Sequence, residues 1–122
     1  VLFRSVQLFV REHGSRRCVV SLQSSHALQW VVPEGALLPL EFGSAGKVLA
    51  GVGAPRLAES VEERERGVAS VSAAVVDRSG AVVAAISVSG PLERLGRKPA
   101  SRFGAAVESA AAALGRELTR RG

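Results

Sequence analysis

Two strand-like runs joined by a tight turn constrain the fold of this chain more than any other feature. Residues 68–76 and 81–89 are rich in valine, alanine and serine, and Asp77-Arg78-Ser79-Gly80 between them is typical of a turn. We therefore predict an antiparallel hairpin over residues 68–89. Centring the turn on Arg78 and Ser79 predicts three cross-strand pairs: Val76 with Ala81, Ser72 with Ala85, and Ser70 with Ser87.

The two faces of this predicted hairpin differ in chemistry, because successive strand residues point to opposite sides. One face is apolar and suits packing against a helix: Val71, Ala73, Val75, Val82, Ala84, Ile86 and Val88. The other is small and, away from the turn, hydroxylated: Val68, Ser70, Ser72, Ala74, Val83, Ala85, Ser87 and Ser89. Small hydroxylated residues leave room for a polar ligand, but they are also ordinary on a sheet face exposed to water. Periodicity alone leaves both interpretations open.

The segments around the hairpin predict an α+β domain with helices packed against an antiparallel sheet. Residues 5–11, 17–23 and 28–32 have the pattern of a three-strand meander, with a turn over 12–16. Residues 43–51 predict a short helix that ends at Gly51, and the charged run 57–66 predicts a solvated helical turn. A final helix is predicted over 100–120, with this apolar stripe: Phe103, Val107, Ala110, Ala111, Leu114 and Leu118.

Charge and composition exclude several classes of partner. The chain has 122 residues, which suits one domain, and its net charge of +5 could attract nucleic acid. Its arginines, however, are scattered from Arg4 to Arg121, and the chain has few aromatic residues to interleave with them. No apolar run approaches the ~20 residues that span a bilayer. We therefore expect a soluble, cytoplasmic domain that binds neither nucleic acid nor membrane directly.

The sequence offers few residues for catalysis or metal binding. His13 and His26 lie in no motif, and together with one cysteine they give no recognisable metal-ligand spacing. Cys18 lies in an apolar run and is predicted to be a small buried hydrophobe. We therefore predict that the chain is not an enzyme and that it uses no metal and no cofactor.

Three motifs, in order along the chain, together resemble the effector-binding domain of the IclR family of bacterial transcription regulators. The first is Leu38-Pro39-Leu40 followed by Ser44-Ala45-Gly46-Lys47-Val48-Leu49-Ala50, and the second is the Glu-rich run 63–67 followed by Val68-Ala69-Ser70-Val71-Ser72-Ala73. The third is Val82-Val83-Ala84-Ala85-Ile86-Ser87-Val88-Ser89-Gly90-Pro91 followed by Arg94-Leu95.

This resemblance implies a GAF-like fold and a small organic effector, often a carboxylate or an aromatic acid. It also implies a homodimeric or homotetrameric regulator that contacts DNA through a winged helix-turn-helix preceding residue 1. Residues 1–122 would then be the effector-binding domain of a longer chain, and the absence of methionine agrees with that expectation. Whether the regulator represses or activates is left open.

The resemblance also places the effector contacts position by position. They fall at the predicted helix entrance and on the two hairpin strands, at Ser44, Ala45, Val68, Ser70, Ser87 and Ser89. The helix entrance would offer N–H groups to a carboxylate, so that no buried arginine is required. The chain departs from the family pattern where it has Glu41 for histidine, Ala74 for proline and Ser60 for an acidic residue.

An assembly-only module is the alternative to a sensor. In this interpretation, the apolar face of the last helix or an open strand edge would pair with another subunit, without any small-molecule ligand. A dose-dependent stabilisation by a ligand would distinguish the two functions.

Overall fold

The computed structural model describes residues 5–23 and 32–121, which form one six-stranded antiparallel sheet with helices on both faces. The predicted α+β class is confirmed. The strand order is β3-β2-β1-β6-β5-β4. The elements are β1 (Ser5–Glu12), β2 (Ser15–Gln23), β3 (Leu37–Pro39), α1 (Ser44–Val48), β4 (Leu57–Val61), β5 (Val68–Val76), β6 (Val82–Pro91), α2 (Leu92–Leu95) and α3 (Pro99–Arg121).

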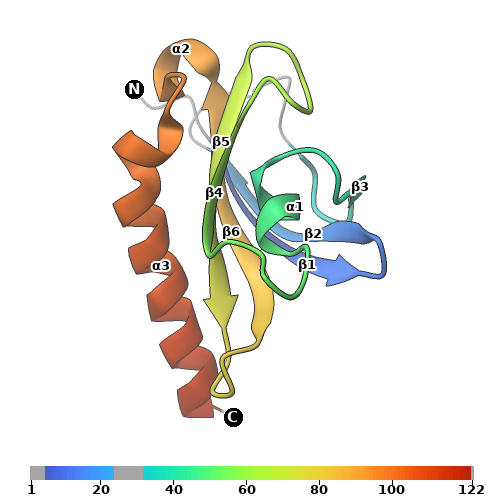
Figure 1. Ribbon diagram of the computed structural model, residues 1–122, viewed down its shortest axis with the longest axis vertical. Helices are drawn as coiled ribbons and strands as arrows, with labels where there is room; N and C mark the ends of the chain where they lie inside the picture. The colour runs from blue at the N-terminus through green and yellow to red at the C-terminus, as the bar shows by residue number, and fades with distance from the viewer. Residues whose placement is uncertain (1–4, 24–31, 122) are drawn as a thin grey trace.

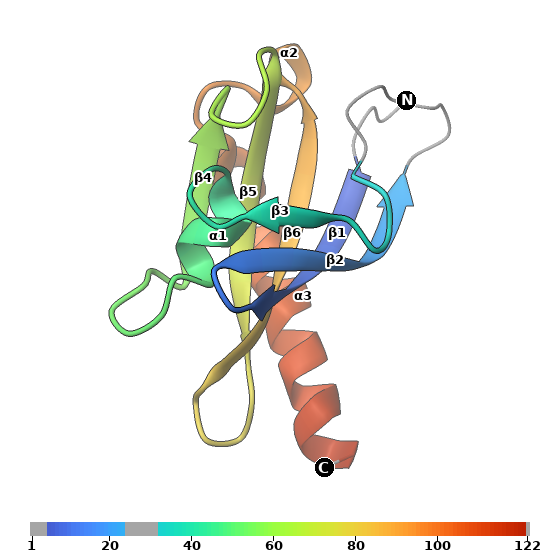
Figure 2. The same ribbon diagram turned by 90° about the vertical axis from the view of Figure 1, so that its right-hand side faces the viewer.

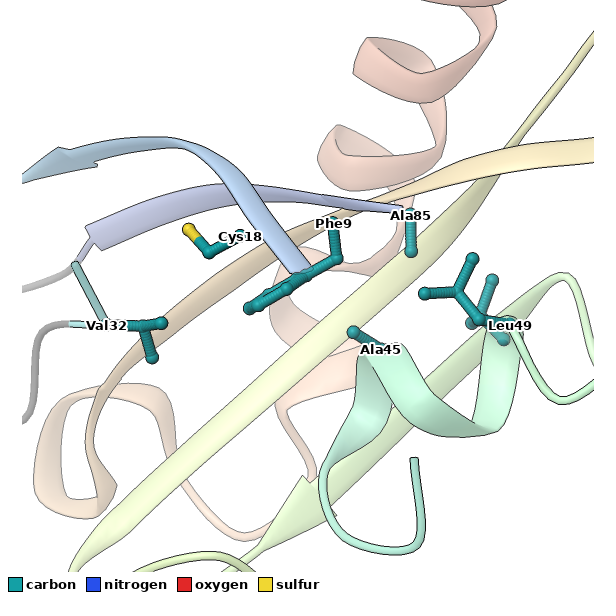
Figure 3. Close-up of a cluster of buried hydrophobic side chains, with 7 residues drawn as sticks. Phe9, Cys18, Val32, Ala45, Leu49 and Ala85 are labelled. Atoms are coloured by element: carbon teal, nitrogen blue, oxygen red, sulfur yellow. The ribbon is translucent and has the colours of Figure 1, made fainter. Parts of the chain in front are cut away.

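Two apolar cores lie on opposite faces of the sheet. The long helix α3 runs along one face, called here the α3 face, and packs mainly on β5 (Figure 1). Strands β1, β2 and β3 curl over the other face, the α1 face, where α1 lies against the sheet (Figure 2). Figure 3 shows Ala45 and Leu49, from α1 and its C-terminal end, gathered with Phe9 and Ala85 of the sheet in the core of the α1 face.

The central hairpin forms as predicted, but its register differs by two residues. Ser72 pairs with Ser87 and Ser70 with Ser89, because the loop shifts the register by one residue and an irregularity between Val75 and Val76 shifts it by a second. The N–H of Asp77 donates to the Ala81 carbonyl at 2.9 Å, and Gly80 adopts a φ of 87°. This is the geometry of a three-residue loop with glycine in the left-handed position. Because the slip is an even number, the serines keep their predicted face.

One valine of the hairpin changes face. A register shift between Val75 and Val76 places one extra residue in β6, so that Val76 pairs with Val82 while Val75 pairs with Ala84. Val82 therefore packs with the core of the α1 face instead of with the helix, contrary to the prediction. A bulge reverses the in-and-out alternation locally, and residue periodicity cannot reveal it.

The segment predicted as a solvated helical turn is instead an edge strand and a loop. Residues of β4 pair antiparallel with β5, and the buried Ser60 pairs with Ser70. Glu59 is held on both sides, since its carbonyl accepts from Lys47 Nζ at 2.8 Å and its Oε1 accepts from the Ala100 N–H at 2.9 Å. Pairing to the sheet thus overrides the charged pattern, and Glu62 turns the chain away with a φ of 58°.

The first hairpin is tighter than predicted. Glu12 pairs with Ser15, so the turn consists of His13 and Gly14, and Arg16 belongs to β2. Of the third predicted strand, residues 28–31 lie outside the described part of the chain. The strand observed next to β2 is β3, at residues 37–39.

The final helix spans residues 99–121, close to its predicted bounds, but its contact face is only partly the predicted stripe. Ala110 and Leu118 are exposed, whereas Gly104 and Gly115 are buried. A Cβ added to Gly115 would lie 2.9 Å from the carbonyl oxygen of Val76. The glycines therefore allow the helix backbone to approach β5 closely, a role that a search for apolar side chains misses.

Candidate functional site

All six residues predicted to contact a ligand line one cavity on the α1 face. They come from the start of α1, from β5 and from β6, and the remaining wall comes from β1, β2, β4 and the loops that precede α1 and β5. The volume open to water is about 30 Å³. The lining residues are Phe9, Arg16, Val32, Gly43, Ser44, Ala45, Ser60, Arg64, Glu65, Val68, Ser70, Ser87 and Ser89.

A cluster of hydrogen-bonded serine hydroxyls forms the polar wall. The Oγ of Ser44 lies 2.7 Å from those of both Ser70 and Ser72, and Ser60 Oγ lies 2.9 Å from Ser70 Oγ. Ser72 is also hydrogen-bonded to Ser87. Ser44, Ser60, Ser72 and Ser87 are buried, so the alternative of serines facing water is wrong for Ser72 and Ser87, whereas Ser70 and Ser89 are partly buried. The helix α1 covers the face that the pattern left open.

Ser89 belongs to a second hydrogen-bonded chain. Its hydroxyl donates to Gln7 Oε1 at 2.9 Å, and Gln7 Nε2 donates to Ser5 Oγ at 2.6 Å. Gln7 is buried, and this pair of bonds satisfies its amide. The Ser89 side chain therefore has a defined orientation at the cavity wall.

Glycines set the position of α1 over the cavity. A Cβ added to Gly46 would lie 1.9 Å from the Leu40 carbonyl oxygen, and Gly43 adopts a φ of 97°. Lys47 then ties the helix to β4 through the Glu59 carbonyl. The helix has five residues and no side-chain cap, so its aligned peptide dipoles are few and carry little charge to its N-terminus.

A buried arginine, which the sequence analysis did not expect, lines the same cavity. The Arg16 side chain is 3% exposed, and its Nη1 donates to the carbonyls of Pro39, at 3.1 Å, and Phe42. Its guanidinium carbon lies 5.1 Å from the centre of the Phe9 ring. Burial, and then the nearby charge of Arg64, lower the pKa of Arg16 to about 10. The group is therefore still a cation at neutral pH.

Two features of Arg16 are unusual for a buried cation. Within the described residues, its Nε has no hydrogen-bond partner, and no carboxylate lies within ion-pair distance of its guanidinium. The turn predicted over residues 12–16 included Arg16, so the burial of this side chain was not predicted. The available signal was its spacing from Cys18, since residues two apart in a strand share a face and both of these side chains are buried.

The residues with catalytic potential lie elsewhere or are inert. Cys18 is buried, and burial raises the pKa of its thiol, which opposes formation of a nucleophilic thiolate. His13 occupies the exposed turn of the first hairpin, and His26 lies outside the described residues. Among the described residues, 5–23 and 32–121, no group of three His, Cys, Asp or Glu side chains is close enough together to hold a metal ion. None of the helices described there has the length and apolarity needed to cross a membrane.

A larger groove, of about 710 Å³, lies on the other face of the sheet. It runs between the β5–β6 turn and the C-terminal half of α3, and its charged walls include Arg56, Arg78 and Arg116. These three side chains are exposed to solvent, which weakens any electrostatic attraction to a ligand. The smaller cavity is the better candidate because its polar groups are buried and converge.

Residues 49–116 match the family described as the bacterial transcriptional regulator IclR C-terminal domain. The matched segment includes four of the six predicted contact residues, Val68, Ser70, Ser87 and Ser89. Among curated proteins, none matches the sequence.

Solved structures of several regulators superpose on this chain. A putative IclR-family transcriptional regulator from Rhodococcus sp. has 25% sequence identity and a TM-score of 0.78, over 97% of this chain and 56% of that one. The repressor BlcR of Agobacterium tumefaciens has 20% identity and a TM-score of 0.77, over 95% of this chain and 60% of its own. The chain thus spans less than two thirds of either regulator.

A third superposition involves a domain with a bound ligand. The inducer-binding domain of the transcription factor PobR from Acinetobacter, a double mutant in complex with 3-hydroxybenzoic acid, has 15% identity and a TM-score of 0.74. The match covers 90% of this chain and 86% of that one. These superpositions confirm the predicted GAF-like arrangement of a curled antiparallel sheet with helices on both faces.

Proposed function

Because this chain belongs to the family of bacterial IclR transcriptional regulator C-terminal domains, we propose that it senses a small organic acid for a transcription regulator. The observation that supports this most directly is the buried, hydroxyl-lined cavity between α1 and the sheet. Six residues chosen from the sequence line it together. A domain of the same fold, the inducer-binding domain of PobR, forms a complex with 3-hydroxybenzoic acid as a double mutant.

The cavity residues have distinct roles in this proposal. Ser44, Ser70, Ser87 and Ser89 orient the effector, since a hydroxyl can both donate and accept a hydrogen bond. Ala45 and Val68 form an apolar wall that is small enough to leave space beside the sheet. Because the hydroxyls already bond to one another and to Gln7, the effector must replace some of these bonds with its own.

Sensing requires two states of the regulator with different affinities for the effector. The cavity is closed by α1 on one side and by the sheet on the other, so a bound effector contacts elements that are far apart in the sequence. We propose that binding alters the relative populations of two subunit arrangements. These arrangements differ in DNA affinity through a winged helix-turn-helix outside this chain, in a cytoplasmic regulator.

A thermal-shift screen tests the proposed function. The chain is titrated with keto acids, hydroxybenzoates and short aliphatic acids. A ligand of the folded state at a hundredfold excess over Kd adds about 2.7 kcal/mol, which raises the Tm by roughly 10 °C for a domain of this size. We expect a dose-dependent rise with one chemical class, and no rise for the variant Ser87→Leu/Ser89→Leu.

Two controls complete the screen. Ser89→Leu alone leaves the buried Ser72–Ser87 hydrogen bond in place, so it blocks the cavity with less risk to the fold. Ser109→Leu, on an exposed part of α3, is the matched control and should bind like the wild type. An effector that shifts Tm equally in wild type and Ser89→Leu would contradict this assignment of the site.

A specific feature favours assembly as a second function. Leu22 and Val20 of β2 are 63% and 39% exposed, and they pair with Val6 and Leu8, which places all four on the α3 face beyond the helix. We propose that this apolar strip of β1 and β2 contacts a second copy of the chain in a homodimer or homotetramer. Assembly and sensing are compatible, since an effector can act on the arrangement of subunits.

A further inference from the structure

Arg16 places a positive charge inside the candidate cavity without a counter-charge. Arg16 is almost fully buried, and its Nη1 donates to two neutral carbonyls, those of Pro39 and Phe42. Nε is buried without a partner among the described residues. Guanidinium groups bind carboxylates in a fork, often through two nitrogens at once, and Nε is one of the nitrogens that can do so.

The surroundings of Arg16 make its charge costly. Burial, followed by the nearby charge of Arg64, which lines the same cavity, lowers the pKa of Arg16. A buried charge is unfavourable unless it is paired, so a carboxylate that binds Arg16 lowers this cost.

We propose that Arg16 is the residue that binds the effector's carboxylate, and that the effector carries a further hydroxyl or oxo group. This inference rests on the proposed function and specifies its ligand. The carboxylate lies against the Nε side of Arg16, and the second polar group contacts the hydroxyls of Ser44 and Ser70.

Matched acids and amides test the role of charge on the unaltered chain. Pyruvate and pyruvamide, lactate and lactamide, and 3-hydroxybenzoate and 3-hydroxybenzamide differ within each pair only at the charged group. We expect each acid that raises Tm to bind in calorimetry with a Kd tenfold or more below that of its amide. Equal binding of an acid and its amide would overturn the assignment to Arg16 while leaving a sensor of neutral ligands.

Substitutions of Arg16 then test whether this residue supplies the positive charge that binds the carboxylate. Arg16→Gln should weaken the binding of pyruvate and lactate by about tenfold to a hundredfold, as loss of a hydrogen bond to a charged group does. Arg16→Lys, which keeps the charge but lacks the fork, should retain part of the affinity. Arg11→Gln is the control, because Arg11 also donates to backbone carbonyls, those of His13, Leu49 and Ala50, but does not line the cavity.

The outcomes separate this inference from the function on which it rests. Full acid affinity in a folded Arg16→Gln domain, as judged by circular dichroism, would show that Arg16 is structural. If Arg16→Gln fails to fold, the acid–amide comparison and the Arg16→Lys variant still test whether Arg16 binds the carboxylate. No response to any acid or amide would overturn both this inference and the proposed function.

Discussion

At the scale of a single residue, the burial of Arg16 should make the affinity of the cavity for an anion depend on pH. Burial lowers the pKa of Arg16 from its ordinary value to about 10. Between these two values the folded domain therefore binds fewer protons than the unfolded chain. The contribution of this group to stability is lost as pH falls through 10 and is complete only above the pKa of arginine in the unfolded chain. At neutral pH the charged side chain thus opposes folding unless an anion pairs with it.

The expected result is an affinity for pyruvate that stays constant from pH 7 to 9. Above pH 10, where the unliganded domain loses the Arg16 proton, the affinity should fall by about tenfold per pH unit. Isothermal titration calorimetry across this range measures the effect, with circular dichroism to show that the domain remains folded. An affinity that is flat to pH 11 would exclude Arg16 as the carboxylate partner.

At the scale of secondary-structure elements, the position of the long helix α3 depends on close backbone contact with the sheet rather than on the volume of its side chains. Gly115 of α3 lies against the Val76 carbonyl, and Gly104 lies near Leu57 of β4. A methyl group at position 115 would meet backbone that cannot rotate away. The helix must then shift outward and weaken its contact with Val71 and Val75.

Gly115→Ala should therefore lower the free energy of unfolding by about 1–3 kcal/mol, as other overpacked contacts do. The loss exceeds the small gain in helix propensity from alanine, about 1 kcal/mol. Urea unfolding of the variant measures this change. The control is Ala113→Leu, on an exposed part of the same helix, which should leave stability within about 0.5 kcal/mol. A more stable Gly115→Ala protein would show that α3 packs less closely than described.

At the scale of the whole molecule, the helix α3 covers only part of the α3 face of the sheet. The helix packs mainly on β5, and the apolar strip of β1 and β2 extends beyond it. If this strip contacts a second copy, Leu22→Glu should convert the oligomer to a monomer because it buries a charge at the interface. Sedimentation equilibrium measures the mass.

Val52→Glu is the matched control for this prediction, since Val52 is a fully exposed valine in the loop before β4. It adds the same charge outside the strip and should leave the mass unchanged. A wild-type chain that is monomeric at all concentrations, or an oligomer that survives Leu22→Glu, would contradict the proposed contact. Binding of an effector by the Leu22→Glu monomer would show that sensing does not need assembly.

The sequence alone predicted those elements whose residues show a local pattern, such as a turn motif or a hydrophobic period. The Asp-Arg-Ser-Gly turn, the alternation along β5 and β6 and the stripe of α3 specify a hairpin, its two faces and a helix, because these depend on neighbours in the chain. The face on which Ser70, Ser87 and Ser89 lie was predictable for the same reason. A two-residue error in register did not change it, since strand periodicity is two.

Only the tertiary structure decided which of these faces is buried and what charge lies within it. Residues 57–61 become a strand because β5 offers an open edge, and the serine face becomes a cavity wall because α1 covers it. Arg16 reaches that cavity because β1 and β2 curl over the sheet and bring a residue from the first hairpin beside Ser44 and Ser87. Burial and electrostatic environment arise from contacts between distant segments, so no local pattern specifies them.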